Sequence, residues 1–283
     1  MNIRENKFIN NFLNENHLDD SFVEAHSSVF NRVLRSLEKC ANCKGLNECS
    51  QLSKGEHLTL TYKGTMIEEI EYCKYARKIN ETKDLKKKYV YCDVPEQLLN
   101  LDLNSISFTN TQKLLYVRYL ELLHEKSNKG LYVYGDMGTG KTYLTIALAN
   151  SLVKNNKKVA FVKVSDFFNS MKSHFSSDTS SILYKTITSL QKAEYLIFDD
   201  IGAESVSEFV RDDVLLRILE YRMENNLTTI FTSNLSKEDL LKHYQYDRRE
   251  KSNLMKAKRL MERIDILSED LVLTGEDLRR KTL

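Results

Sequence analysis

The stretch GDMGTGKT, residues 135–142, decides how the rest of this 283-residue chain is interpreted. It places three of the chain's nine glycines directly before a lysine and a threonine, Lys141 and Thr142. The pattern is G-x-x-x-x-G-K-[ST], in which glycines let backbone N–H groups turn inward around a phosphate because a Cβ would block the approach. An apolar run precedes it and an amphipathic segment, residues 143–156, follows it. This strand–loop–helix context predicts a nucleotide site.

The residues of the loop have different predicted roles in binding a nucleotide. Lys141 is expected to reach the β- and γ-phosphates, and Thr142 to offer a hydroxyl to Mg²⁺, while the helix N-terminus adds its dipole. The predicted nucleotide-binding residues are Gly135, Asp136, Met137, Gly138, Thr139, Gly140, Lys141, Thr142 and Tyr143.

Polar residues at the ends of two other apolar runs complete a hydrolytic site. Asp199 and Asp200 end the run EYLIFDD, and Asn234 ends TTIFTSN. We expect Asp199 to hold the metal and its water shell, Asp200 to polarise the attacking water, and Asn234 to orient that water. The carboxyl ends of parallel strands form a shared crevice, which would bring these side chains near the glycine-rich loop.

Two arginine pairs follow downstream. Arg259 and Arg263 lie four residues apart, on one face of a predicted helix, and Arg279 and Arg280 lie in TGEDLRRK. An arginine that reaches a neighbour's γ-phosphate stabilises charge in the transition state. Most single arginines only keep a surface soluble, so the ordered series of loop, acidic pair, asparagine and arginines carries the prediction.

The pattern along the chain predicts an α/β fold with a smaller domain before it. From residue 130 onward short apolar runs alternate with helical patterns, which favours a buried parallel sheet covered by helices. Residues 1–39 have helical spacing, and two short strands meet at Lys63-Gly64 as a hairpin. We predict an N-terminal α+β domain over 1–76, a lysine-rich linker over 77–99, and a P-loop ATPase domain over 100–283.

Composition excludes little beyond membrane proteins. Hydrophobic residues make up 41% and charged residues 29%, as in ordinary soluble proteins, and no window approaches a membrane span. The net charge of +2 neither indicates nor excludes nucleic-acid binding, since a local groove matters more than the total. The first residues, MNIRENKF, lack the apolar core of a signal peptide, so we expect a cytoplasmic protein with reduced thiols.

A cysteine cluster predicts a structural zinc site. The pair Cys40-x-x-Cys43 has zinc-knuckle spacing, and Zn²⁺ takes four sulfur or nitrogen ligands in a tetrahedron. Cys73 is the third expected ligand, and Cys49 competes with His57 for the fourth place. A redox pair is the alternative, but it would leave Cys49 and Cys73 unexplained. Cys92 lies beyond the lysine-rich segment and is not expected to bind metal.

Taken in order, GDMGTGKT, YLIFDDIGAE, TIFTSN, LMERI and TGEDLRR resemble the helicase-loader group of AAA+ ATPases, most closely the DnaI-type loaders. The resemblance covers residues 100–283. It implies that Lys141 and Thr142 form Walker A and that Asp199 and Asp200 form Walker B. It further implies the following assignments: Asn234 as sensor 1, Arg263 as the trans-acting arginine finger with Arg259 as the runner-up, and Arg279 as sensor 2.

The resemblance also implies partners. It implies that the zinc-bearing N-terminal module grips the hexameric replicative helicase, and that the ATPase domains associate side by side. Single-stranded DNA would run along residues 165–175, where Phe167, Phe168, Lys172 and His174 suit stacking and phosphate contact. The alternative for the two phenylalanines is an ordinary place in the core.

The function predicted is ATP-dependent loading of the replicative helicase onto single-stranded DNA during primosome assembly, with weak hydrolysis that single-stranded DNA stimulates. Initiator or other primosome proteins are further possible partners. One alternative is a transposition-helper ATPase, which resembles this domain but lacks the zinc module. A second is a zinc-stabilised adaptor that uses ATP only as a switch. A third is a P-loop kinase, which would leave Asn234 and Arg263 unused.

Overall fold

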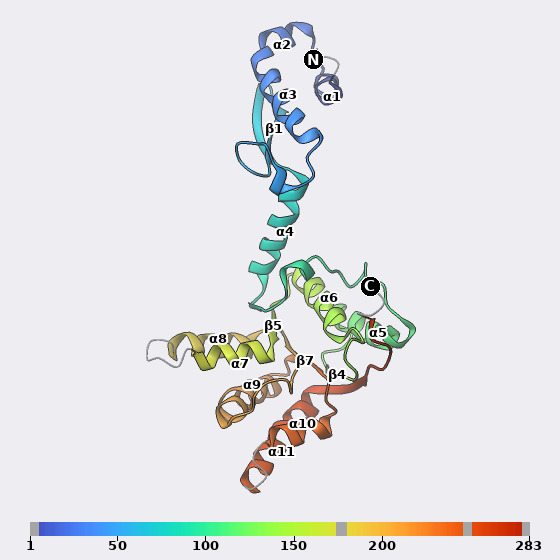
Figure 1. The fold of residues 1–283 in the computed structure, drawn as a ribbon, viewed down its shortest axis with the longest axis vertical. Coiled ribbons are helices and arrows are strands. Elements are labelled where there is room, and N and C mark those ends of the chain that lie inside the picture. Colours follow the sequence, from blue (N-terminus) through green and yellow to red (C-terminus); the bar gives the residue numbers. More distant parts are fainter. Residues whose placement is uncertain (1–5, 174–179, 246–250, 279–283) are drawn as a thin grey trace. The chain divides into compact units, whose positions relative to one another are not determined.

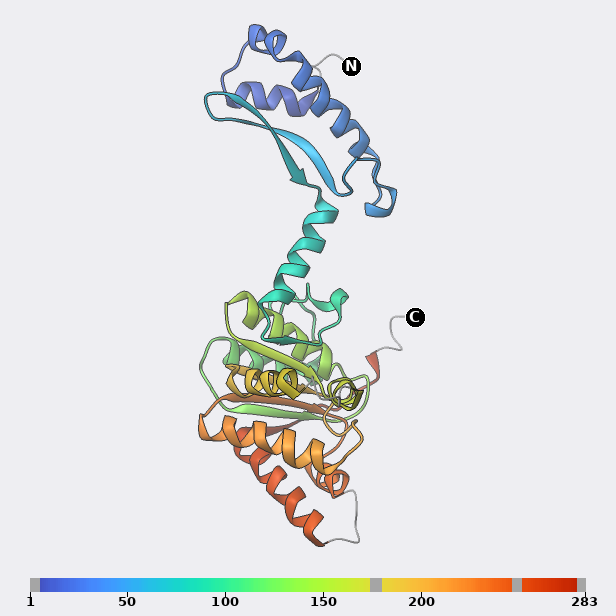
Figure 2. The same cartoon turned by 90° about the vertical axis from the view of Figure 1, so that its left-hand side faces the viewer.

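The computed structural model describes residues 6–173, 180–245 and 251–278, and the chain divides into two compact units. The N-terminal unit comprises Met1–Lys83 and the C-terminal unit comprises Asp84–Leu283. Each is described separately below, and both are drawn in Figures 1 and 2.

A six-stranded sheet with the order β3-β5-β6-β7-β4-β8 forms the centre of the C-terminal unit (Figure 1). The strand pairings in this sheet are parallel over the described residues, as the alternating pattern predicts. Parallel strands need crossover connections, which here are mostly helical. The strands are β3 (Tyr91–Cys92), β4 (Gly130–Tyr134), β5 (Val159–Lys163), β6 (Tyr195–Asp199), β7 (Thr228–Ser233) and β8 (Ser268–Val272).

Helices cover both faces of the sheet and bury a separate apolar core on each (Figure 2). One core joins the sheet to α5 (Lys113–Leu123) and α6 (Lys141–Lys154). The other joins it to the remaining helices and a π-helical segment, Phe209–Leu216. Those helices are α7 (Val164–Ser173), α8 (Ser180–Lys192), α9 (Arg217–Glu224), α10 (Lys237–Tyr244) and α11 (Lys251–Leu267). The four central strands are almost wholly buried because both faces are covered.

The N-terminal unit packs three helices on an antiparallel hairpin, as the sequence predicts. The elements are α1 (Lys7–Glu15), α2 (Asp20–Ala25), α3 (Ser27–Ala41), β1 (Glu56–Tyr62) and β2 (Met66–Tyr72). Phe12, Phe30 and Leu60 belong to its small core. A small hairpin cannot be stable without such a cover over one face.

Residues 77–99 differ from the linker that the sequence predicts. Helix α4 runs over Lys74–Lys88, and Tyr91–Cys92 form strand β3 at an edge of the large sheet. Lysine has a good helix propensity, so a lysine-rich segment can be both solvated and helical. The division between the units falls after Lys83, seven residues later than the predicted boundary at residue 76.

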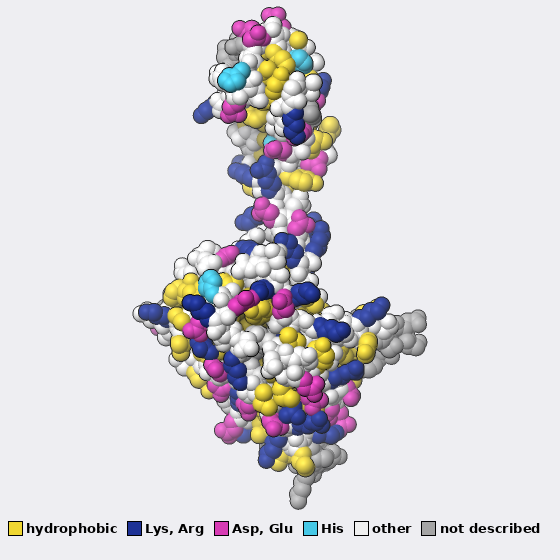
Figure 3. All heavy atoms as spheres, turned by 180° about the vertical axis from the view of Figure 1, so that it is seen from behind, with side chains coloured by type: hydrophobic (Ala, Val, Ile, Leu, Met, Phe, Trp, Pro, Cys, Tyr) yellow, Lys and Arg dark blue, Asp and Glu magenta, His cyan; other side chains and the backbone are white. Residues whose placement is uncertain are grey.

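The surface of the C-terminal unit carries charges of both signs. Figure 3 shows lysine, arginine, aspartate and glutamate side chains interspersed on the face that it presents. Within the described ranges, no helix has the length and apolar character needed to cross a membrane.

Candidate functional site

The glycine-rich loop links β4 to α6, and tight packing explains its glycines. Gly140 caps α6 with a left-handed backbone, φ 92°. A Cβ on Gly135 would lie 2.2 Å from the carbonyl oxygen of Leu273, and a Cβ on Gly138 would lie 1.9 Å from a carboxylate oxygen of Asp277. The loop is therefore held by the segment that follows β8, and only glycine fits at these positions.

Lys141 points into the loop rather than into solvent. Its Nζ donates to the carbonyl oxygens of Gly135 at 2.7 Å and Asp136 at 2.8 Å, and to Asn234 Oδ1 at 3.0 Å. The ammonium group thus joins the loop to the end of β7. It is placed where an anion in the loop would meet a positive charge.

Asp199 is the buried acid of the site. Its Oδ1 accepts hydrogen bonds from Thr142 Oγ1 at 2.9 Å and from Thr232 Oγ1 at 2.7 Å. Burial raises the pKa of Asp199, and the two hydroxyl hydrogen bonds oppose that rise. Thr142 and Asp199 present adjacent oxygen atoms, the ligand type that Mg²⁺ prefers, so the donor set fits this ion.

Asp200 takes a backbone conformation that is unusual for a side-chain-bearing residue, with φ 58°. Its N–H donates to Thr232 Oγ1 at 2.9 Å, and its Oδ1 accepts from Asn234 Nδ2 at 2.9 Å. Left-handed backbone of this kind costs free energy and clusters at functional sites. Here it directs the carboxylate toward Asn234 at the neighbouring strand end.

A pocket of about 350 Å³ lies beside the glycine-rich loop. Thr109, Thr139 and Gly275 are among the residues that line it. Next to it, Gln112 Nε2 donates to the carbonyl oxygen of Thr139 at 2.8 Å, and Leu278 N–H donates to the carbonyl oxygen of Gly138 at 3.0 Å. The pocket opens where the nonphosphate part of a nucleotide could lie.

Comparison with known proteins also indicates an ATP-binding protein. The chain matches the model of the IstB-like ATP-binding proteins over residues 38–282. It is also 30% identical over 277 residues to the replicative helicase loader DnaI of Bacillus subtilis, which covers 95% of this chain and 88% of that protein. The chain belongs to this ATP-binding family, among the DnaI-type helicase loaders.

Other relatives and solved structures of the DnaI/DnaC group are also similar to this chain. The replicative helicase loader DnaC of Escherichia coli K12 is 27% identical over 38% of this chain and 43% of its own length. A crystal structure of DnaI matches with a TM-score of 0.58 and 33% identity over 66% of this chain and 98% of that chain. A putative primosome component from Streptococcus pyogenes matches with a TM-score of 0.54 and 29% identity over 68% and 95%. The fold is that of the AAA+ P-loop ATPases.

In this DnaI-type chain, helix α11 holds the two predicted finger arginines in ion pairs. Arg259 Nη2 lies 2.5 Å from Glu220 Oε1, and Arg263 Nη2 lies 3.8 Å from the same oxygen. Arg263 Nη1 also donates to Glu262 Oε2 at 2.9 Å. The Arg259 side chain is 57% exposed and that of Arg263 is 18% exposed, so Arg263 is the less accessible of the two arginines.

Several predicted residues do not join the site. Phe167 and Phe168 are buried in the core, so of the two alternatives for them the structure supports the place in the core and not stacking on DNA bases. The backbone of Lys172 lies in α7. Arg279, Arg280 and His174 lie outside the described residues.

The described residues do not support the zinc site predicted for the loader's N-terminal unit. Across the described ranges, no three His, Cys, Asp or Glu side chains converge as metal ligands do. Gln51 Nε2 donates to Cys40 Sγ at 3.2 Å, Cys43 Sγ to the Gly45 carbonyl oxygen at 3.4 Å, and Gly55 N–H to Cys49 Sγ at 3.4 Å. The sulfur atoms therefore have separate local partners.

The other two predicted zinc ligands also lie apart from any metal-binding group. His57 lies on β1 opposite Glu71, with its Nδ1 buried and without a hydrogen-bond partner. Cys73 follows β2, and its N–H donates to the Gly55 carbonyl oxygen. The zinc site therefore stays a prediction from the cysteine spacing, which does not fix where the sulfur atoms point.

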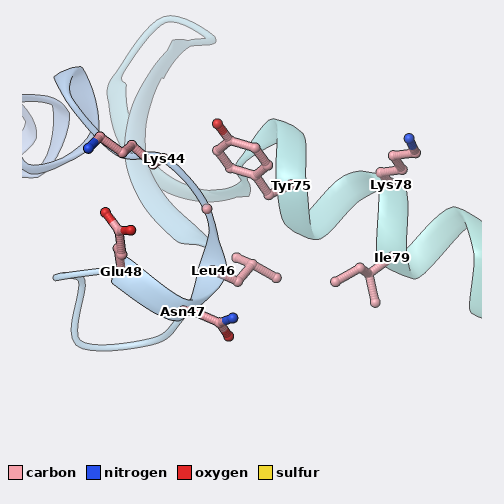
Figure 4. Close-up of a pocket in the computed structure, with 8 residues that line it drawn as sticks. Lys44, Leu46, Asn47, Glu48, Tyr75, Lys78 and Ile79 are labelled. Carbon is pink, nitrogen blue, oxygen red and sulfur yellow. The ribbon is translucent and has the colours of Figure 1, made fainter. Parts of the chain in front are cut away.

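The N-terminal unit has a groove of about 460 Å³ between the segment after α3 and the start of α4 (Figure 4). Leu46, Tyr75 and Ile79 give it an apolar lining, and Lys44 and Lys78 stand at its sides. The Tyr75 hydroxyl donates to the Cys43 carbonyl oxygen at 3.3 Å, which fixes the ring against the opposite wall. Sequence inspection did not identify this groove.

Three residues of the ATP site were also missed. Thr232 bonds both acids, Gln112 supports the loop, and Asp277 packs on Gly138. The polar end of TTIFTSN was a usable signal for Thr232, and T-N-T-Q, a capping box, was one for Gln112. No local pattern indicates Asp277.

Proposed function

We propose that this chain is an ATP-dependent loader that places the hexameric replicative helicase on single-stranded DNA in the cytoplasm. The observation that carries the proposal is the likeness to Bacillus subtilis DnaI over 95% of the chain, a span that reaches well into both units. A transposition-helper ATPase would need a likeness confined to the C-terminal unit. The family model alone, which begins at residue 38, does not favour that alternative.

ATP would bind with its phosphates in the glycine-rich loop and its base beside the pocket near Thr109. Thr142 and Asp199 would hold Mg²⁺, which supplies charge neutralisation for phosphoryl transfer. Lys141 would exchange its bonds to Gly135 and Asp136 for the phosphates. Asp200 would accept a proton from the attacking water, and Asn234, already bonded to Asp200, would orient that water.

Neighbouring subunits would complete the site. We assign the arginine finger to Arg263, which leaves Glu220 and stabilises the negative charge on the neighbour's γ-phosphate. An ion pair at a partly exposed surface is worth only ~0–1 kcal/mol, so release from Glu220 is a small cost. Arg279 would contact ATP within its own chain as sensor 2. An isolated subunit would therefore hydrolyse ATP slowly, and assembly on single-stranded DNA would stimulate it.

The N-terminal unit would bind the helicase, and the C-terminal units would associate around DNA. The experiment uses the full-length chain, the helicase hexamer of the same organism and closed circular single-stranded DNA. We expect helicase to become topologically linked to the circle only with this chain and ATP. Lys141→Ala should retain helicase binding but lose at least ~10-fold of the loading, since ATP binding is removed.

The same experiment separates the alternatives. Loading that proceeds equally with Lys141→Ala would favour an adaptor whose ATP site is dispensable. The absence of any helicase binding by a folded wild-type chain would contradict the loader proposal itself.

A further inference from the structure

Four residues with buried polar side chains are linked by hydrogen bonds, one of which is made to the backbone carbonyl oxygen of Tyr244. Glu204, Arg211, Tyr244 and Asn253 are each at most 3% exposed. They come from the turn after β6, the π-helical segment, α10 and α11. The chain of bonds thus connects the turn that presents Asp200 to the helix that carries Arg259 and Arg263.

The first link fixes the turn. Glu204 Oε2 accepts the N–H of Gly202 at 2.8 Å, two residues after Asp200. Gly202 has φ 94°, and a Cβ there would lie 2.8 Å from Leu235 and 2.9 Å from Leu240. Glu204 therefore holds a turn that cannot relax without disturbing the segment from β7 to α10. The strained backbone of Asp200 depends on that turn.

The second link joins this turn to α10. The Tyr244 hydroxyl donates to Glu204 Oε1 at the last residue of α10. Burial raises the pKa of Tyr244 well above its ordinary value, and the nearby Glu204 carboxylate raises it further. The hydroxyl therefore keeps its proton and remains the donor.

The third link reaches α11. Arg211 Nη1 donates to the Tyr244 carbonyl oxygen at 3.1 Å, and Arg211 Nη2 donates to Asn253 Oδ1 at 3.2 Å. Asn253 lies in the first turn of α11, on the same rigid helix as Arg263. Arg211 belongs to a π-helical segment, a conformation that is often found at functional sites.

Stability alone does not explain such a network. Buried charges that are replaced by well-packed apolar residues often leave a protein equally stable or more stable, because desolvation offsets the attraction. A network in which every polar group has a hydrogen-bond partner instead fixes one arrangement of the elements that it joins. Here the geometry that it defines is the placement of α11 relative to Asp200.

We propose that Glu204 and Tyr244 are positioning residues that fix the arginine helix α11 relative to the chain's own Asp200. The inference rests on the proposed trans role of Arg263 and deepens it. It means that each subunit presents its arginine to a neighbour in a position set by its own ATP site. Neither residue lines the pocket beside the glycine-rich loop, so both would act through α11.

Mixed oligomers test this inference directly. One chain carries Lys141→Ala, which cannot bind ATP but can offer Arg263. The other carries Arg263→Ala, which can bind ATP but offers no arginine. A one-to-one mixture with single-stranded DNA should hydrolyse ATP much faster than either variant alone. Tyr244→Phe, which deletes only the linking hydroxyl, is then added to one chain or the other.

The expected effect of Tyr244→Phe on ATP hydrolysis depends on which of the two chains carries it. In the arginine donor it should lower kcat of the mixture ~10-fold at unchanged KM for ATP, because the hydrolysing site is intact and only α11 is displaced. In the ATP-binding chain it should lower kcat less than ~3-fold, since that chain's α11 carries no finger. Equal loss in both placements, or no loss in the donor, would overturn the inference.

Two controls complete the design. Glu204→Gln in the donor that keeps Tyr244 should retain at least half of the mixed activity, because its amide oxygen can accept from Gly202 N–H and its amide nitrogen can donate to the Tyr244 hydroxyl. Melting temperatures of all variants should agree within a few degrees. If the loss of ATP hydrolysis correlates with a lower melting temperature, and not with which chain carries the substitution, Glu204 and Tyr244 are not positioning residues. If the parent mixture shows no gain at all, the trans role of Arg263 is wrong, and the inference falls with it.

Discussion

At the scale of single residues, Thr232 shows how one hydroxyl can organise two acids. Its Oγ1 donates to Asp199 at 2.7 Å and accepts the N–H of Asp200 at 2.9 Å. The two acids are adjacent in sequence, yet one faces Thr142 and the other faces Asn234. Thr232 thus keeps the two carboxylates in separate directions, that of Asp199 toward Thr142 and that of Asp200 toward Asn234.

We expect Thr232→Val to lower kcat for ATP hydrolysis by roughly 10-fold or more, because a lost hydrogen bond to a buried charge costs ~1.5–3 kcal/mol. Binding of a nonhydrolysable ATP analogue should change little, since the glycine-rich loop is untouched. The matched control is Thr228→Val at the start of the same strand, where the hydroxyl donates to the Asn128 carbonyl oxygen. Equal kcat losses for both variants would show that Thr232 acts through strand stability alone.

At the scale of elements, Arg222 ties α9 to its neighbours. Its side chain is wholly buried and donates to the carbonyl oxygens of Leu190, Ala193 and Thr228, among other acceptors. It therefore holds the end of α8 and the start of β7 in one place. The fork of five N–H donors on arginine makes this possible, and lysine cannot reproduce it.

Arg222→Lys should destabilise the C-terminal unit by about 3 kcal/mol, because several buried carbonyl oxygens lose their donors. For a unit of this size that lowers the melting temperature by roughly 6–12 °C. Arg217→Lys on the same helix is the matched control, since Arg217 is exposed and should shift melting by no more than a degree or two. Thermal unfolding followed by circular dichroism measures both, and a similar shift for both would contradict the assigned role.

Elements with strong periodicity were predictable, and those with mixed signals were not. The strands that end at Asp199 and Ser233 are continuous apolar runs, and both were predicted. Helix α4 was missed because its lysines suggested a solvated link, although Ala76 and Leu85 are buried. Helix α10 was missed although Ser236 caps it, because its eight residues give only a short apolar pattern.

The candidate site likewise contains residues that could be predicted from the sequence and residues that could not. Lys141, Asp199 and Asn234 were predicted together because parallel strands bring their carboxyl ends to one edge. Asp277 could not be predicted, since only the completed fold brings it to Gly138. The cysteines differ from both cases, because their spacing predicts a zinc site that the described residues do not support.

At the scale of the whole molecule, the groove of the N-terminal unit is the surface we expect to contact the helicase. Ile79 is 44% exposed there, beside Leu46 and between lysines that suit an acidic partner segment. Ile79→Glu should weaken helicase binding by at least ~10-fold, because burying an unpaired charge is costly.

Ile70→Glu provides the matched control for this prediction. Ile70 lies on β2 of the same unit and is even more exposed, but it does not line the groove. Its substitution should leave helicase affinity within ~2-fold, as measured by titration with the labelled hexamer. Equal weakening by both substitutions would assign the contact to another face of the unit.

The pairing of β8 with β4 has a consequence for how this protein is made. Ser268 lies beside Gly130 in the sheet but leaves the ribosome 138 residues later. At ~5–20 residues per second, β8 is synthesised roughly 7–28 seconds after β4. During synthesis, an apolar strand is thus left with an open edge that invites aggregation. A nascent chain that stalls before β8 would keep this edge open and would therefore be a substrate for chaperones.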